Sequence, residues 1–184
     1  MQDEERFRFD LEGYLVVPGV LDADHLTDLN AVCDDPPAGE WTEGGTLSAS
    51  RVSRWGPAFQ ALIDHPKLLP YLVELLGPKF RLDHDYCIFM RSGADRGGLH
   101  GGPSPQIHAG DHWYQCHDGV IRNGLTVFTY CLSDHGPGAG GFACVPGTHK
   151  SNFIRHIPSE VRRFERPAGY VRQVEAAAGD VIVF

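Results

Sequence analysis

Residues 80–91 read Phe80-Arg81-Leu82-Asp83-His84-Asp85-Tyr86-Cys87-Ile88-Phe89-Met90-Arg91. Most even-numbered side chains in this run are apolar or aromatic, and most odd-numbered ones are polar. A period of two is the period with which side chains alternate between the faces of a β-strand. We therefore predict one long strand in an antiparallel sheet. The side chains expected to be buried are Phe80, Leu82, Tyr86, Ile88 and Met90.

Three shorter segments downstream also favour strands, because each is apolar or alternating and each is bounded by glycine, proline or aspartate. They are residues 125–132, which place Thr126, Phe128 and Tyr130 on one face, residues 142–145, and residues 181–184.

Two helices are predicted upstream of the long strand. Asp22 is a suitable N-cap for the first, and Gly77-Pro78 ends the second, which is expected from about residue 66 to residue 76. The apolar stripes are Leu26, Leu29 and Val32 in the first helix, and Leu68, Leu69, Leu72, Val73 and Leu76 in the second. Helices followed by short strands predict a mainly β domain, a β-sandwich or jelly roll with N-terminal helical cover.

The composition narrows the class of protein. The length of 184 residues suits a single domain over residues 1–184. A net charge of -8 without a basic stripe argues against a nucleic-acid partner. No run approaches the roughly 18 apolar residues of a membrane span, and the acidic start is unlike a secretory signal. Five cysteines without a Cys-x-x-Cys pair favour neither a disulfide framework nor a zinc site, so a reducing cytoplasm is expected.

The segment 97–119 is rich in histidine, glycine and aspartate. Such a segment could supply a non-haem iron site, which needs two imidazoles and one carboxylate on one face. However, none of the ten histidines is followed two positions later by Asp or Glu. The residues alone therefore leave two alternatives open, a metal site or a solvent-exposed loop.

A second segment, residues 140–150, resembles a sequence motif of a known protein family. The string is Gly140-Gly141-Phe142-Ala143-Cys144-Val145-Pro146-Gly147-Thr148-His149-Lys150. It resembles the Pro-Gly-Ser-His-Lys signature of the phytanoyl-CoA dioxygenase family, with its glycine-rich approach. Other segments resemble further motifs of that family in the expected order: residues 9–20, residues 76–78 with the strand after them, residues 125–134 and residues 175–184.

This resemblance implies a double-stranded β-helix, which is a jelly roll of the cupin type. It also implies Fe(II) as cofactor and 2-oxoglutarate as cosubstrate, with decarboxylation of 2-oxoglutarate coupled to oxidation of a small organic substrate. His100 stands where the family's first metal-binding histidine is expected, but Gly102 occupies the place of the carboxylate. Asp111, or His108 in place of His100, is the expected way to complete the site.

Further expectations concern the cosubstrate. Arg91, at the end of the long strand, is expected to pair with a carboxylate of 2-oxoglutarate through two parallel hydrogen bonds. Thr126 and Tyr130 are expected to line the pocket, with packing as the alternative role for both. His149 and Lys150 are expected to be structural.

Three functions follow from the resemblance. The first is hydroxylation of a small organic molecule, with no nucleic-acid or membrane partner. The second is iron-dependent halogenation, because a His-x-Gly pattern is found in related halogenases. The third is a non-catalytic relative that has lost iron.

The apolar residues 181–184 at the end of the chain lead to one more expectation. Domains rarely end inside an apolar strand. We therefore expect later core strands, a distal histidine and an arginine beyond Phe184. On that expectation the chain as given exposes a strand edge, binds iron weakly, aggregates readily and is inactive.

Overall fold

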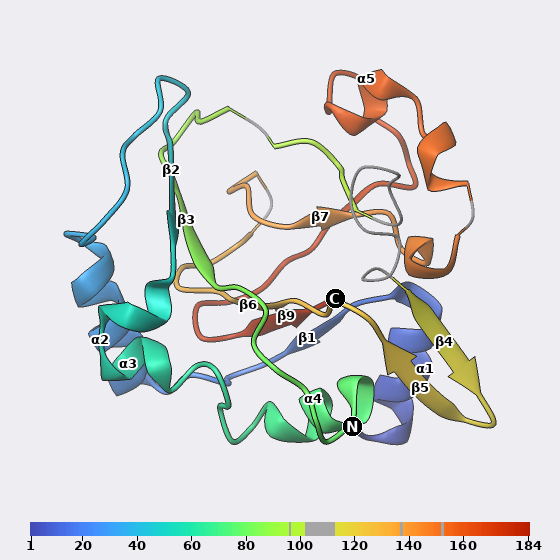
Figure 1. Ribbon diagram of the computed structural model, residues 1–184. Coiled ribbons are helices and arrows are strands. Elements are labelled where there is room, and N and C mark those ends of the chain that lie inside the picture. Colours follow the sequence, from blue (N-terminus) through green and yellow to red (C-terminus); the bar gives the residue numbers. More distant parts are fainter. Residues whose placement is uncertain (96, 102–112, 137, 152) are drawn as a thin grey trace.

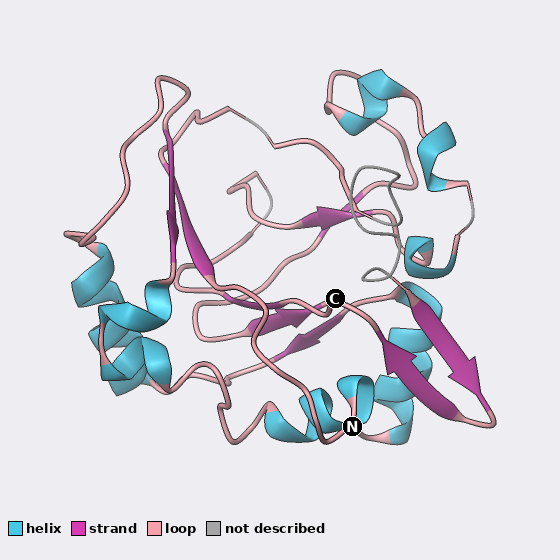
Figure 2. Ribbon diagram, in the orientation of Figure 1, coloured by secondary structure: helices cyan, strands magenta, loops and turns pink. Residues whose placement is uncertain are grey.

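The computed structural model describes residues 1–95, 97–101, 113–136, 138–151 and 153–184. The α-helices are α1 (Asp3–Glu12), α2 (Ala23–Cys33), α3 (Pro57–Gln60), α4 (Leu69–Leu76) and α5 (Ser159–Arg162). The strands are β1 (Leu15–Val17), β2 (Thr46–Ser50), β3 (Tyr86–Met90), β4 (Tyr114–His117), β5 (Val120–Asn123), β6 (Phe128–Tyr130), β7 (Ala143–Cys144), β8 (Arg172–Gln173) and β9 (Val181–Val183). Short 3-10 helices cover Val52–Trp55, Thr148–Lys150 and Ile154–His156. The expected mainly β class with N-terminal helices is confirmed (Figures 1 and 2).

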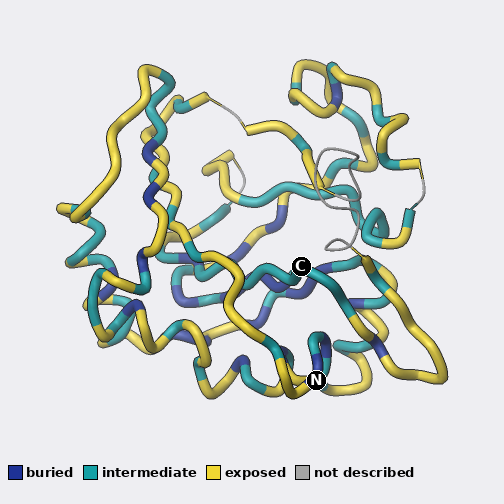
Figure 3. Tube along the Cα trace, in the orientation of Figure 1, coloured by how far each residue is buried: buried dark blue, intermediate teal, exposed yellow. Residues whose placement is uncertain are grey.

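The central sheet has the strand order β1-β9-β6, and all of its pairs are antiparallel. Val183 of β9 lies opposite Leu15 of β1 on one side and Phe128 of β6 on the other. All three residues of β9 are fully buried (Figure 3). The strand expected at residues 181–184 is confirmed, together with its need for two neighbours. The expectation that it exposes an edge was wrong, because β1 comes from the opposite end of the chain and covers that edge.

The two faces of this sheet pack against different layers. Val181 and Val183 face a cluster that includes Phe9 of α1 and Leu75 of α4. Ile182 faces the opposite way, into a cluster with the buried side chains Tyr14, Cys131, Val174 and Ala176. Helices therefore cover one face, and the segments around β7 and β8 cover the other (Figure 1).

The long strand is shorter than expected and buries its other face. It pairs with β2 only over residues 86–90. Tyr86, Ile88 and Met90 are each about half exposed, at 47%, 55% and 49%, and Leu82 is 47% exposed. The odd-numbered Cys87 and Phe89 pack instead against the cluster beside α2 and α3. The predicted burial of Leu82, Tyr86, Ile88 and Met90 was therefore wrong, whereas Phe80 is half-buried.

The physical reason is visible in the neighbours of β3. The backbone carbonyl of Asp85 accepts from Arg51 N at 2.8 Å, and its carboxylate accepts from Ser53 N at 2.6 Å. This turn ends β2 at Ser50, so residues 80–85 have no partner strand. Cys87 and Phe89 are also apolar, so the alternation alone did not decide which face the helices cover.

The predicted helices are confirmed with adjustments. The carboxylate of Asp22 accepts from His25 N at 2.8 Å and caps α2, whose Leu29 is fully buried. The second predicted helix begins at Leu69, three residues later than expected. Its buried residues are Leu72 and Leu75, together with the preceding Leu68, whereas Val73 is 43% exposed. No helix among the described residues is long and apolar enough to cross a membrane.

Several elements were not predicted, among them α1 and the hairpin of β4 and β5. Helix α1 buries only Phe9, so its sequence has no apolar stripe to reveal it. The hairpin of β4 and β5 turns at Asp118-Gly119, both with positive φ (50° and 74°). Asp-Gly is a strong signal for a two-residue hairpin turn, and it was present in the sequence.

Candidate metal and cosubstrate site

His100 lies in the loop that follows β3, and its side chain is exposed. The neighbouring Leu99 N donates to Arg162 O at 2.8 Å, which ties this loop to the end of α5. The ring nitrogen Nδ1 of His100 lies 2.8 Å from the carbonyl oxygen of Gly98. Because a carbonyl only accepts, this bond requires the proton on Nδ1. Nε2 then keeps its lone pair, which is the state in which histidine binds a metal.

The other expected ligands, Asp111 and His108, lie outside the described residues, as does Gly102. Among the residues that are described, no group of three or more His, Cys, Asp or Glu side chains could hold a metal ion. One imidazole therefore fits a metal, and the assignment of Asp111 stays a prediction.

Arg91 follows the last residue of β3 and is exposed. Its backbone N donates to Gly45 O at 3.0 Å, and its guanidinium lies 4.1 Å from the centre of the Trp41 ring. Stacking on an aromatic face orients a guanidinium without using its N–H donors, which remain able to bind a carboxylate. Its role towards 2-oxoglutarate stays a prediction.

Tyr130 is the last residue of β6, whereas Thr126 lies two residues before that strand begins. Thr126 precedes Val127, whose N and O both pair with the backbone of Phe184, at 2.8 and 3.0 Å. It therefore lies next to the end of β9. The hydroxyl of Tyr130 donates to Leu62 O at 2.6 Å on the helical side of the sheet, and burial raises its pKa. This geometry suits a packing role for Tyr130, and the cosubstrate roles of both residues stay predictions.

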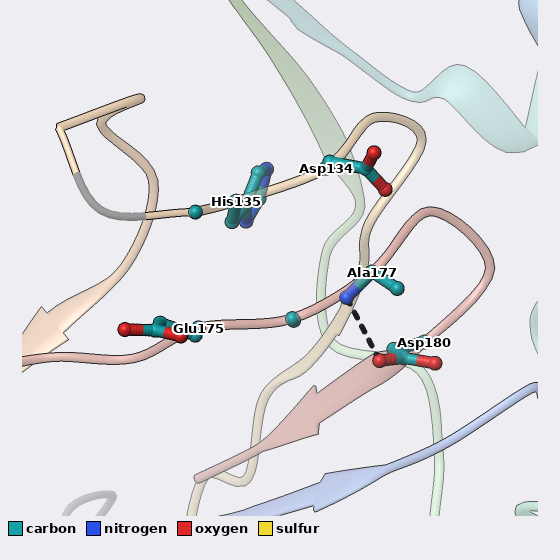
Figure 4. A pocket seen from close by; sticks show the side chains of 7 residues that line it. Asp134, His135, Glu175, Ala177 and Asp180 are labelled. Atoms are coloured by element: carbon teal, nitrogen blue, oxygen red, sulfur yellow. Dashed lines mark hydrogen bonds between the residues drawn. The ribbon is translucent and has the colours of Figure 1, made fainter.

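A shallow pocket of about 410 Å³ lies at the other end of β9 (Figure 4). Its lining residues are Asp134, His135, Gly136, Glu175, Ala176, Ala177 and Asp180. The carboxylate of Asp134 accepts from Ala178 N, and that of Asp180 accepts from Gly19 N and Ala177 N, all at 2.8–2.9 Å. In Figure 4, Glu175 points away from both aspartates. The acidic groups therefore hold turns in place and do not converge on one point.

His135 in this pocket is also structural. Its backbone forms a β-bridge with Ala176, and its Nδ1 is buried without a hydrogen-bond partner. Burial lowers the pKa of the imidazole, so the ring is held in the neutral form. Gly141 provides the space for this ring, because a Cβ there would come within 2.9 Å of it.

The segment 147–150 contacts the C-terminal end of α1. Gly147 N donates to Glu12 O at 2.7 Å, and His149 Nε2 lies 3.1 Å from Asp10 O. Lys150 contacts the carbonyl of Asp10 as well as its carboxylate, the latter at 3.3 Å. These bonds satisfy carbonyl groups that a helix end leaves unpaired. The contacts fit the structural role expected for His149 and Lys150.

The same contact explains the glycine at the end of α1. Gly13 has a φ of 81°, and a Cβ on it would lie 2.2 Å from His149 Nδ1. Burial lowers the pKa of His149, and its Nδ1 has no hydrogen-bond partner. Two sequence motifs that are more than 130 residues apart, around Gly13 and around His149, are thus two sides of one contact.

Comparison with known proteins gives a consistent result. Residues 9–184 match the family described as Phytanoyl-CoA dioxygenase (PhyH). A search of curated proteins gives no match.

Solved structures share the fold. HygX from Streptomyces hygroscopicus, with nickel, 2-oxoglutarate and hygromycin B bound, superposes with a TM-score of 0.82 at 24% identity. That superposition covers 100% of this chain and 77% of HygX. The non-haem α-ketoglutarate-dependent epimerase SnoN from nogalamycin biosynthesis gives a TM-score of 0.62 at 17% identity, with 98% and 72% coverage. The carbocyclase SnoK from the same biosynthesis gives 0.63 at 15% identity, with 100% and 74% coverage.

The family match spans nearly the whole chain, and its two motifs around Gly13 and His149 are in direct contact in the structure. The chain belongs to the phytanoyl-CoA dioxygenase family, whose members are iron(II)- and 2-oxoglutarate-dependent non-haem dioxygenases.

Proposed function

We propose that this protein hydroxylates a small organic molecule at an iron centre within a double-stranded β-helix. The observation that carries the proposal is the geometry of His100, whose Nδ1 bond to Gly98 O leaves Nε2 able to bind a metal. Asp111 is the proposed carboxylate ligand. HygX, which shares the fold, supports the proposed iron centre and small-molecule substrate, since its structures hold nickel or iron, 2-oxoglutarate and hygromycin B.

When bound, iron and 2-oxoglutarate together supply the activation of oxygen. The residues of this chain position these groups. The Gly98 carbonyl fixes the tautomer and the orientation of the His100 ring. The bond from Leu99 to Arg162 holds the loop that carries it. Arg91, oriented by Trp41, is proposed to bind a carboxylate of 2-oxoglutarate.

Halogenation is the second candidate, and Gly102 favours it. A glycine two positions after the metal-binding histidine leaves a coordination position that a halide can fill. If Asp111 does not bind iron, halogenation replaces hydroxylation as the proposed reaction.

The experiment is a measurement of succinate formed from 2-oxoglutarate by the full-length protein with Fe(II) and oxygen. We expect succinate from the wild type and little from His100→Ala. The matched control is His117→Ala, since His117 is 90% exposed on the β4–β5 hairpin. Equal succinate from wild type and His100→Ala would reject His100 as a ligand.

A panel of small-molecule substrates with added chloride separates the two reactions. Mass spectrometry distinguishes a product that has gained oxygen from one that has gained chlorine. Absence of both succinate and metal binding in a folded wild-type protein would favour a non-catalytic family member.

A further inference from the structure

Three segments that are far apart in the sequence meet at Asp10 of α1. Its carboxylate accepts a hydrogen bond from the hydroxyl of Tyr114, the first residue of β4. The other carboxylate oxygen lies 3.3 Å from Nζ of Lys150, which also donates to the backbone carbonyl of Asp10. Figure 1 shows the β4–β5 hairpin beside α1. One carboxylate thus joins α1, the hairpin and the segment 147–150.

The ring of Tyr114 is held as well as its hydroxyl. It meets the imidazole of His149 edge to face, with ring centres 4.6 Å apart and an angle of 85° between the planes. Nζ of Lys150 lies 5.9 Å from the centre of the Tyr114 ring, which is within reach of a cation–π contact. The ring also packs against the buried cluster that includes Phe9 and Leu75. Several contacts therefore keep the Tyr114 side chain in one orientation.

Asp10 stands where a carboxylate does not stabilise a helix. It lies near the C-terminal end of α1, whose last turn contains no basic residue. That end of a helix carries partial negative charge and disfavours acidic side chains. The hydrogen bond from Tyr114, together with Lys150, lowers the pKa of Asp10 and keeps its carboxylate ionised. The contacts with Tyr114 and Lys150, rather than the helix itself, thus account for an acidic residue at this position.

Tyr114 also stands at one end of the expected metal-binding segment. At the other end, next to His100, Leu99 N donates to Arg162 O at 2.8 Å. Tyr114 is the first strand residue after the proposed ligand Asp111, which lies outside the described residues. A site binds more tightly when its ligands are held in place before the metal arrives. Both described ends of this segment are tied to other parts of the fold.

We propose that Tyr114 is a positioning residue for the metal site, and that it acts through its hydrogen bond to Asp10. This inference rests on the proposed iron centre. The bond limits the conformations open to the segment that leads into β4, so less conformational freedom is lost when the metal binds. Lys150 supports the bond, because it holds the carboxylate that accepts it.

Tyr71 provides a matched control. Its hydroxyl donates to Glu5 Oε1 at 2.6 Å, so it also ties a tyrosine to a carboxylate of α1. Tyr71 belongs to α4 and packs against the same buried cluster as Tyr114. Removing either hydroxyl therefore removes one bond of the same kind, but only Tyr114 adjoins the metal-binding segment in the sequence.

The test is a titration of the full-length protein with Mn(II) in the presence of 2-oxoglutarate, followed by electron paramagnetic resonance, together with thermal denaturation without metal. Tyr114→Phe and Tyr71→Phe should lower the melting temperature by similar amounts. We expect only Tyr114→Phe to weaken Mn(II) binding, by about fivefold, the factor that corresponds to one net hydrogen bond. Wild-type affinity in Tyr114→Phe, or an equal loss of affinity in Tyr71→Phe, would overturn the proposal.

A double variant tests whether Tyr114 acts through Asp10. Asp10→Ala should weaken Mn(II) binding, and adding Tyr114→Phe to it should weaken binding no further. Losses that add in the double variant would contradict the route through Asp10. A wild-type protein that binds no Mn(II) would reject the iron centre and this inference with it. Binding by the wild type that is unchanged in Tyr114→Phe would reject this inference alone.

Discussion

At the scale of single residues, the contact between Gly13 and His149 links the two family motifs. Gly13 is required both by its backbone, with a φ of 81°, and by the imidazole that lies where a Cβ would be. Sequence reasoning expected a structural His149, but it could not find the contact partner. Nothing in local periodicity links Gly13 to a residue so distant along the chain.

The first prediction is that Gly13→Ala lowers the free energy of unfolding by about 2–4 kcal/mol, because left-handed strain and a steric clash add. The control is Gly19→Ala. Gly19 has a φ of 57°, and a Cβ added there would have nothing within 4 Å, so this variant should cost only about 1 kcal/mol. Urea denaturation measures both. Equal losses for the two variants would mean that His149 does not occupy the space beside Gly13.

The second prediction concerns pH. Burial is the largest cause that lowers the pKa of His65, His135 and His149 from 6.5. In the unfolded chain these groups take up protons at a higher pH than in the folded protein. Their contribution to stability is therefore fully present above pH 6.5. It is lost as the pH falls through the lowered pKa values that these histidines have in the folded protein.

Urea denaturation at several pH values checks this dependence. We expect the free energy of unfolding to fall as the pH is lowered below about 6.5. His149→Gln should make the decrease shallower, whereas His117→Gln on the exposed hairpin should leave it unchanged. A decrease with the same slope in His149→Gln would remove His149 as a contributor.

At the scale of elements, β3 shows what periodicity could and could not predict. The alternation of residues 80–91 correctly indicated a strand in an antiparallel sheet. It did not indicate the buried face, because Cys87 and Phe89 are as apolar as their even-numbered neighbours. The buried face is determined by α2 and α3, which pack against the odd-numbered side chains of β3.

The third prediction tests this face. Phe89 stacks on Trp55, with ring centres 6.4 Å apart, whereas Ile88 is 55% exposed. We expect Phe89→Ala to cost about 2 kcal/mol or more, less than a fully buried Phe would cost. Ile88→Ala should cost about 0.5 kcal/mol or less. Thermal and urea denaturation of both variants measure these losses of stability. A larger loss of stability for Ile88→Ala than for Phe89→Ala would mean that the even-numbered side of β3 is the buried one.

For other elements, the sequence carried signals of different strength. The cap at Asp22 and the stop at Gly77 marked helix ends that the structure confirms. Helix α1 was not predicted because its Phe7 and Leu11 are exposed, so it lacks an apolar stripe. The β4–β5 hairpin could have been predicted from Asp118-Gly119, and the signal was overlooked.

At the scale of the whole molecule, the two ends of the chain meet in one sheet. Strand β1, near the N-terminus, pairs with β9, which ends one residue before Phe184. The two strands are separated by most of the sequence, so local patterns could predict both strands but not their partnership. The family resemblance predicted the class of protein correctly, because motif order along the chain reflects the whole fold.

The site was less predictable than the fold. A metal site depends on side chains that converge in space, and none of the histidines follows the expected His-x-Asp spacing. Arg91 and His100 each have a geometry that suits the proposed role. Asp111 lies outside the described residues, and its role as the carboxylate ligand stays a prediction.

The measurement that tests the account most directly is a titration of the full-length protein with Mn(II), a redox-stable substitute for Fe(II), in the presence of 2-oxoglutarate and followed by electron paramagnetic resonance. We expect the wild type and His117→Ala to bind Mn(II) alike, and His100→Ala to bind it more weakly by about tenfold or more. Binding of Mn(II) by His100→Ala with the wild-type affinity would contradict the assignment of His100 as a metal ligand.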